Sequence, residues 1–178
     1  INPSRIGIIK ILKLMNVKIK LKNLNKYKGE KISDLYVKSQ ENIKAINCPT
    51  HFNSASIDEF LLIFLLAAKA NGISYFKNLS ELNQKESPRL KWAKTILTKI
   101  GVKAVITNDS IKIYGNPGLN IKKKISIKNY LKDHRVFMTS VIAALSFGGK
   151  WQIHDKKSIN TSFPTFINKI KHLGAKIN

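Results

Sequence analysis

Apolar positions along the chain alternate between two spacings, one typical of helices and one typical of strands. Leu90, Ala93, Leu97 and Ile100 fall on one face of a helix, and Gly101 follows them. A short alternating strand pattern begins directly after this glycine. The ranges 3–21 and 162–177 show the same order of a helix, an Asn or Gly and a strand, with Asn16 and Gly174 in the place of Gly101. Such residues can adopt the left-handed conformation that ends a helix.

A second kind of helix alternates with the first. The segments 58–76 and 133–153 both start at an aspartate, continue as an apolar run and reach a glycine before a strand pattern. The stretch FLLIFLLAA within 60–68 is apolar on every side, which predicts a helix buried by its neighbours. The two starting aspartates, Asp58 and Asp133, are 75 residues apart, and Pro88 and Pro164 are 76 apart.

These spacings predict an internal repeat of a β-α-β-α type, seen nearly twice, with a partial copy at the N-terminal end. We expect a three-fold pseudo-repeat of the α/β (α+β) class, with helices inside and sheets outside. Residues 105–115 predict two strands joined by a turn at 108–110. Ser87 and Pro88 predict the N-cap and first turn of the next helix. No low-complexity linker divides the chain, so residues 1–178 are interpreted as one domain or most of one.

Charge and cysteine content restrict the possible functions. The net charge of +22 favours an anionic partner, and a basic nucleic-acid-binding module is one alternative function. The lysines are spread along the whole chain, however, which is more typical of a composition bias, so we expect no nucleic acid. The single cysteine fits a reducing, cytoplasmic location. The four histidines have no metal-ligand spacing, and the longest apolar run is too short to span a membrane.

Candidate functional residues gather at the predicted helix starts, where free N–H groups favour anions. The chain has 29 lysines and three arginines, and two of these arginines, Arg89 and Arg135, lie at such starts. An arginine offers a planar fork that a lysine lacks. The alternatives are that Asp58 and Asp133 are plain N-caps and that Lys85 and Glu86 form a solvated surface pair. Arg5, in the first turn of its helix, is expected to be structural.

Several motifs together resemble one enzyme family. The sequences SIDEF, NLSELNQKESPRL, DHRVFMTSVIAAL and TSFPTFINKIKHLGAKI are similar to the C-terminal part of the 5-enolpyruvylshikimate-3-phosphate synthases (3-phosphoshikimate 1-carboxyvinyltransferases), and the similarity extends from Asn2 to Ile177. The sister family that transfers enolpyruvate to UDP-N-acetylglucosamine is an alternative that shares the fold. The resemblance implies a domain of repeated βαβαββ units. It also implies that the chain is a fragment, inactive alone, which lacks a second domain and part of the first.

The resemblance further implies a reaction and the residues for it. The 5-hydroxyl of shikimate 3-phosphate attacks phosphoenolpyruvate, and phosphate leaves. Asp58 matches the carboxylate that holds the hydroxyl and accepts its proton, and Glu86 matches the acid that handles the proton at C3. Lys85 matches a substrate-binding lysine, and Arg89 and Arg135 match the arginines that bind phosphoenolpyruvate. No metal or organic cofactor is implied.

Overall fold

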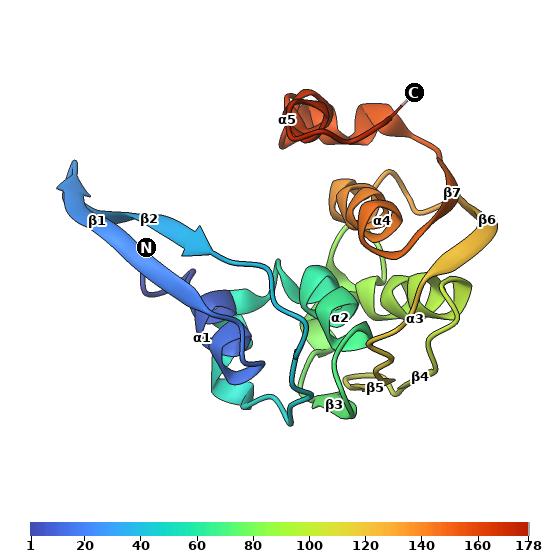
Figure 1. The fold of residues 1–178 in the computed structure, drawn as a ribbon, viewed down its shortest axis with the longest axis horizontal. Coiled ribbons are helices and arrows are strands. Elements are labelled where there is room, and N and C mark those ends of the chain that lie inside the picture. The colour runs from blue at the N-terminus through green and yellow to red at the C-terminus, as the bar shows by residue number, and fades with distance from the viewer. Residues whose placement is uncertain (178) are drawn as a thin grey trace.

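The computed structural model describes residues 1–177, in which helices and strands alternate as the sequence predicts (Figure 1). The elements are α1 (Gly7–Leu14), β1 (Ile19–Tyr27), β2 (Glu30–Val37), α2 (Phe60–Ala68), β3 (Ile73–Phe76), α3 (Arg89–Lys99), β4 (Ala104–Ile106), β5 (Ile111–Tyr114), β6 (Ile121–Ile127), α4 (His134–Phe147), β7 (Gly148–Ile153) and α5 (Phe166–His172). Short 3-10 helices span Thr50–Phe52, Ser54–Ser56, Ser80–Gln84 and Lys156–Thr161. The expected α/β (α+β) class is confirmed.

The strands form three small sheets around the helices. β1 and β2 make an antiparallel hairpin, β3, β5 and β4 make an antiparallel sheet in that order, and β6 pairs with β7 in parallel. Figure 1 shows α2 in the middle of the molecule, with the hairpin extending on one side and the other sheets along the outside. The expected placement of helices inside and sheets outside is therefore confirmed.

The repeat predicted from the spacing is visible in the pairing of the strands. An extended segment before α2 pairs in parallel with β3 through the Asn47–Tyr75 bridge, and α2 is the crossover between them. In the next unit β6 pairs in parallel with β7, and α4 is the crossover. Parallel neighbours require such a crossover, which is usually a helix. Residues 43–114 thus form a βαβαββ unit, whereas the N-terminal copy contains only α1, β1 and β2 within the described residues.

The predicted helix ends are confirmed, with two corrections nearby. Asn16, Gly101 and Gly174 have φ angles of 67°, 87° and 95°, which is the left-handed conformation. No strand follows Gly174 over residues 175–177, so the third predicted strand is wrong within the described range. The predicted capping by Ser87 is also wrong, because its hydroxyl donates to the carboxylate of Asp133 and α3 has no side-chain cap.

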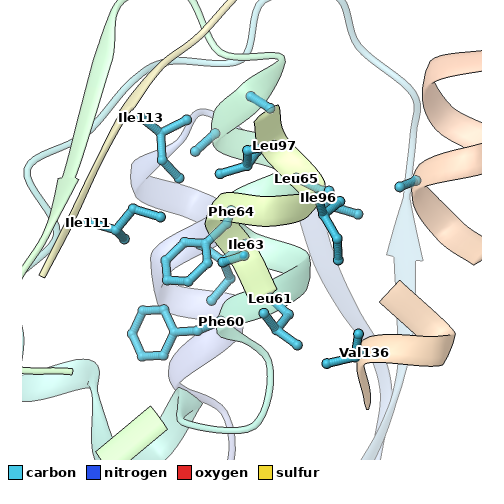
Figure 2. Close-up of a cluster of buried hydrophobic side chains, with 14 of the residues drawn as sticks. Phe60, Leu61, Ile63, Phe64, Leu65, Ile96, Leu97, Ile111, Ile113 and Val136 are labelled. Atoms are coloured by element: carbon cyan, nitrogen blue, oxygen red, sulfur yellow. The ribbon is translucent and has the colours of Figure 1, made fainter. Parts of the chain in front are cut away.

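The core is organised around α2. Seven of its nine residues are buried, and their side chains pack against α3, α4 and β5 (Figure 2). Phe60, Phe64 and Phe76 make mutual edge and stacked ring contacts. The prediction that α2 is buried on every side is wrong at one position, because Leu62 is 40% exposed. Within residues 1–177, no helix combines the length and apolar character needed to cross a membrane.

Leu62 is exposed because it faces an open apolar groove. The groove has a volume of about 500 Å³ and lies between α1, α2 and α4, beside the end of β2. Its apolar walls include Ile8, Leu12, Leu62, Leu66, Ile142 and Phe147. In the 43–114 unit the residues after β5 close directly onto the end of α2: the N–H of Asn116 donates to the carbonyl of Ala68 at 2.8 Å.

Gly115 allows that closure, and it generates a prediction with an internal control. A Cβ at this position would lie 2.1 Å from the carbonyl oxygen of Ala70 and 2.7 Å from that of Ala67. We expect Gly115→Ala to lower the free energy of unfolding by about 3 kcal/mol, at the upper end of the usual cost of overpacking. Gly118→Ala is the control, because the nearest atom to its Cβ would be 3.8 Å away. Equal melting temperatures for the two variants would contradict this role of Gly115.

Candidate active site

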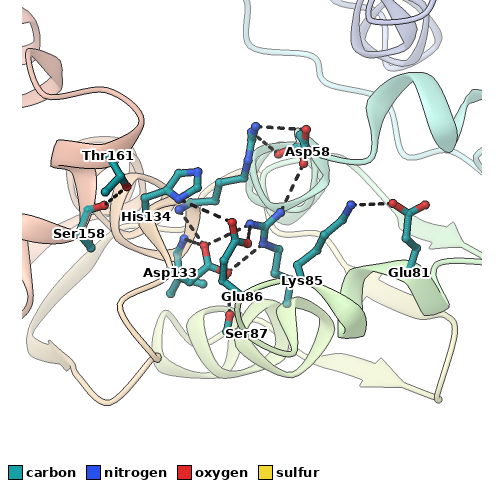
Figure 3. Close-up of polar contacts among 12 residues, drawn as sticks. Asp58, Glu81, Lys85, Glu86, Ser87, Asp133, His134, Ser158 and Thr161 are labelled. Atoms are coloured by element: carbon teal, nitrogen blue, oxygen red, sulfur yellow. Dashed lines mark hydrogen bonds and ion pairs between the residues drawn. The ribbon is translucent and has the colours of Figure 1, made fainter.

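The candidate residues come from the first turns of α3 and α4 and from the loops that precede α2 and α3. Asp58 lies two residues before α2, Glu86 lies three residues before α3, and Asp133 is directly followed by α4. Figure 3 shows the side chains of Asp58, Glu86, Asp133 and His134 directed toward one region at these helix starts. The three helix starts are thus joined by side-chain contacts.

Arg89 is at the centre of these contacts. Its side chain is 2% exposed, and a buried charge is stable only when it is paired and hydrogen-bonded. Three carboxylates provide the pairing. Nε and Nη2 donate to the two oxygens of Asp133 at 3.0 and 3.4 Å, and Nη1 donates to Oδ1 of Asp58 at 3.4 Å. Nη2 also donates to the Glu86 carboxylate. The guanidinium plane therefore fixes the relative positions of α2, α3 and α4.

Asp133 has a wider role than the predicted helix cap. The cap itself is confirmed, because Oδ1 accepts from the backbone N–H groups of Arg135 and Val136 at 2.9 and 3.4 Å. The other oxygen accepts from the Ser87 hydroxyl at 2.8 Å. Burial alone would raise the pKa of the Asp133 carboxyl, but the hydrogen bonds and charge of Arg89, with Ser87 and the N–H of Arg135, hold the pKa below its usual value.

All three arginines of the chain contact Asp58. Besides Arg89, the Nη1 of Arg5 and the Nη2 of Arg135 each lie 3.3 Å from Oδ2 of Asp58. The alternative that Asp58 is a plain N-cap is wrong, since α2 has no side-chain cap and the carboxylate binds arginines. The expected place of Arg5 in the first turn of its helix is wrong, because α1 begins at Gly7. Its side chain is 68% exposed and reaches Asp58 across 53 residues of sequence.

Arg135 is partly exposed and is held by the loop before α2. Its Nη1 donates to the backbone carbonyl of Asp58 at 2.8 Å and lies 4.0 Å from the carboxylate of Glu59. Burial raises the pKa of the Glu59 carboxyl, the charge of Arg135 opposes this effect, and the charge of Asp58 adds to it. One nitrogen of the Arg135 guanidinium is bound to the backbone, and part of the guanidinium stays exposed to solvent.

Glu86 and Lys85 point to different partners. The carboxylate of Glu86 is 51% exposed, contacts Arg89, and lies 4.0 Å from Nδ1 of His134. The ammonium of Lys85 instead binds Glu81 at 2.6 Å. The alternative of a Lys85–Glu86 surface pair is therefore wrong. The structure brings Asp58, Glu86, Arg89 and Arg135 together as expected, whereas Lys85 is turned toward Glu81.

The arrangement combines two arginines that can bind anions, Arg89 and Arg135, with the carboxylates of Asp58 and Glu86. Arginine forks at helix starts suit phosphate and carboxylate groups. Asp58 lies among guanidinium groups, whereas Glu86 is half exposed beside an imidazole, so the two carboxylates have different environments. Groups in such different environments can act as acid and base in one reaction. Over residues 1–177, His, Cys, Asp and Glu form no group of three or more that could hold a metal ion.

The buried Arg89–Asp133 pair predicts a stability that depends on pH. We expect Asp133→Asn to lower the free energy of unfolding by about 3 kcal/mol at neutral pH, because it leaves a buried guanidinium partly unpaired. The pKa of Asp133 is lowered in the folded protein, so its contribution is complete above the unfolded pKa and is lost as pH falls through the folded value. The difference between wild type and variant should therefore narrow in urea melts below about pH 4.

Asp155→Asn is the control for this experiment. Asp155 is exposed and adopts a left-handed conformation that asparagine also accepts. The melting curves of Asp155→Asn should therefore match those of the wild type at each pH. A difference between wild type and Asp133→Asn that stayed constant from pH 7 to pH 3 would contradict the charge-based account.

Comparison with known proteins identifies the family. Residues 1–170 match the family described as EPSP synthase (3-phosphoshikimate 1-carboxyvinyltransferase). The chain is 37% identical over 178 residues to the 3-phosphoshikimate 1-carboxyvinyltransferase of Ruthia magnifica subsp. Calyptogena magnifica, covering 100% of this chain and 40% of that protein. It is 37% identical over 179 residues to the Zymomonas mobilis protein of the same name, covering 99% and 39%.

Solved structures agree with these relatives. An EPSP synthase from Acinetobacter baumannii superposes with a TM-score of 0.93 at 33% identity, covering 100% of this chain and 41% of that one. The enolpyruvyl transferase NikO from Streptomyces tendae shares the fold, with a TM-score of 0.68 at 15% identity over 97% of this chain and 36% of its own. The chain thus spans about 40% of the length of its curated relatives. On the family match over residues 1–170, the chain belongs to the EPSP synthase family.

Proposed function

We propose that the protein containing this chain transfers the enolpyruvyl group of phosphoenolpyruvate to the 5-hydroxyl of shikimate 3-phosphate, with release of phosphate. The observation that carries this proposal is the convergence of Arg89 and Arg135 with Asp58 and Glu86 at three helix starts, in a chain of this family. The substrates are both anions, and the site supplies guanidinium groups with planar forks. The relatives named above support the same reaction class.

Arg89 and Arg135 would bind phosphoenolpyruvate by exchanging partners. In the structure, carboxylates of the protein occupy the positions that a substrate carboxylate or phosphate would take on these guanidinium groups. Of the three carboxylates that pair with Arg89, Glu86 is the most exposed, so it is free to move away from the guanidinium. Asp133 is buried and remains, so Arg89 keeps its orientation while its outer edge receives the anion.

Asp58 and Glu86 would carry the proton transfers. Asp58 accepts the proton of the 5-hydroxyl as its oxygen forms a bond to C2 of phosphoenolpyruvate. Glu86 delivers a proton to C3, which gives a tetrahedral intermediate. Loss of a proton from C3 and departure of phosphate then restore the double bond. Lys85 would contact substrate after its ammonium leaves the partly exposed pairing with Glu81, which is weak enough to exchange.

We also propose that residues 1–178 are most of one domain of that enzyme, whose other domain completes the cleft. The N-terminal repeat contains α1, β1 and β2, but within the described residues it has no counterpart of α2 and β3. Two features support the addition of such a helix and strand. The apolar groove lies between α1, α2 and α4, and over residues 1–177 β2 pairs with one strand, whereas its counterpart β5 pairs with two.

The exposed apolar side chains of the hairpin support the same proposal. Leu21, Leu24, Ile32, Leu35 and Val37 are all exposed, although residues of this type usually become buried in a sheet that packs against other elements. A further strand along β2 and a helix in the groove would cover part of this surface. The partners of the chain are then the rest of its own polypeptide and two small anions, in the cytoplasm.

A charge-preserving substitution tests the arginine roles in the full-length enzyme. We expect Arg135→Lys and Arg89→Lys each to lower kcat/KM for phosphoenolpyruvate about tenfold to a hundredfold. A fork makes two hydrogen bonds where an ammonium makes one good contact, and one charged hydrogen bond contributes roughly 1.5–3 kcal/mol. Arg135 gives the cleaner test because it is partly exposed, whereas Arg89 also stabilises the fold.

Lys91→Arg is the matched control for these variants. It exchanges the two basic residue types in the opposite direction, at an exposed position on α3 outside the site. Steady-state kinetics and melting curves should be unchanged. Near wild-type kinetics in both Arg135→Lys and Arg89→Lys would show that the planar guanidinium is not needed at these two positions.

The domain proposal predicts that the 178-residue chain alone does not turn over substrate. Half of the cleft would be absent, and this catalysis depends on holding two reactants in position. The measurement is phosphate release from phosphoenolpyruvate and shikimate 3-phosphate, with the full-length enzyme as the positive control. Phosphate release by the purified chain would overturn the claim that a second domain is needed.

A further inference from the structure

Arg5 is the most exposed of the three arginines that contact Asp58, and the proposed reaction does not use it. Its Nη1 lies 3.3 Å from Oδ2 of Asp58, and its side chain is 68% exposed. The exposure of the three side chains increases in the order Arg89, Arg135 and Arg5. Asp58 therefore has three counter-ions: Arg89 is buried, Arg135 is partly exposed and Arg5 is exposed.

The backbone fixes the position of Arg5. Asn2 accepts hydrogen bonds through its side-chain oxygen from the N–H and hydroxyl of Ser4, and the N–H of Arg5 donates to the carbonyl of Asn2 at 2.9 Å. Two residues later, Gly7 packs so closely on the segment before Asp58 that a Cβ would lie 2.2 Å from Oγ of Ser56. This contact holds the start of α1 beside the loop that carries Asp58.

The three arginines differ in what else they bind. Arg89 is held by Asp133, and Arg135 is held by the backbone carbonyl of Asp58. Among residues 1–177, the side chain of Arg5 forms a hydrogen bond and ion pair with Asp58 alone. When an anionic substrate binds to Arg89 and Arg135, their contacts to Asp58 weaken, and Arg5 is the cation that remains for this carboxylate.

We propose that Arg5 is a positioning residue for Asp58. It holds the carboxylate oriented toward the attacking hydroxyl while Arg89 and Arg135 bind the substrate anion. This inference rests on the proposed function for its catalytic consequence, but the contact itself does not depend on that function.

Kinetics of the full-length enzyme separate this role from a structural one. We expect Arg5→Gln to lower kcat about tenfold, because part of the contribution of a positioned base is lost. The KM for phosphoenolpyruvate should change less than about twofold, and the melting temperature should not change, since an exposed ion pair contributes little to stability. Arg5→Lys should recover most of kcat, because Arg5 makes a single contact that an ammonium can also make. Lys13→Gln, at an exposed lysine on α1, the helix that follows Arg5, is the control for lost charge.

Three results would overturn the inference. One is a wild-type kcat in Arg5→Gln. Another is a rise in KM with unchanged kcat, which would place Arg5 on the substrate anion. The third is a fall in kcat that follows a fall in melting temperature, which would indicate a structural residue.

A second readout does not require turnover. With ¹³C-labelled aspartate carboxyl groups, the Asp58 signal is assigned by its absence from Asp58→Asn. This signal should shift in Arg5→Gln and stay in place in Lys13→Gln. An unshifted signal in Arg5→Gln would overturn the inference. If the wild-type enzyme lacked enolpyruvyl transfer, the proposed function would fail, and the carboxyl signal would still decide the contact between Arg5 and Asp58.

Discussion

The buried ion pair between Arg89 and Asp133 is the interaction on which the site depends. A guanidinium removed from water needs full pairing, and Asp133 provides two oxygens for it while also capping α4 and accepting from Ser87. One carboxylate thus fixes the starts of α3 and α4 relative to each other. Asp58 adds α2 to the same guanidinium. The three loops that carry candidate catalytic groups are therefore positioned by one charged centre rather than by their own conformations.

The same centre keeps several arginine nitrogens neutralised by carboxylates of the protein itself. These partners differ in burial, from Asp133 inside to Glu86 outside. Under the proposed function, exchange with a substrate anion would occur at the outer edge, and the inner edge would stay fixed. A lysine could supply the charge, but its ammonium could not bind two or three carboxylates in one plane.

The parts of the fold that the sequence predicted are those decided by neighbours in the chain. Helix ends at Asn16, Gly101 and Gly174 follow from a local backbone preference, and the strands and turn within 105–115 follow from a local pattern. The cap of α3 could not be predicted in this way, because the Ser87 hydroxyl binds the buried carboxylate of Asp133, 46 residues away. The contact between Arg5 and Asp58 could not be predicted for the same reason, since the two residues are 53 positions apart. Leu62 is exposed because of a groove that no local pattern reveals.

The sequence separation of the contacts within the charged centre also has a consequence for the order in which the chain can fold. Arg89 is 44 residues from Asp133, and Arg135 is 77 residues from Asp58. A nascent chain that has not yet reached residue 133 contains α3 and its arginine but not the carboxylate that permits their burial. Closing such long loops is entropically costly before the pair forms. Local helices and the hairpins can form earlier, whereas the centre that aligns the helix starts can be completed only after α4 has been synthesised.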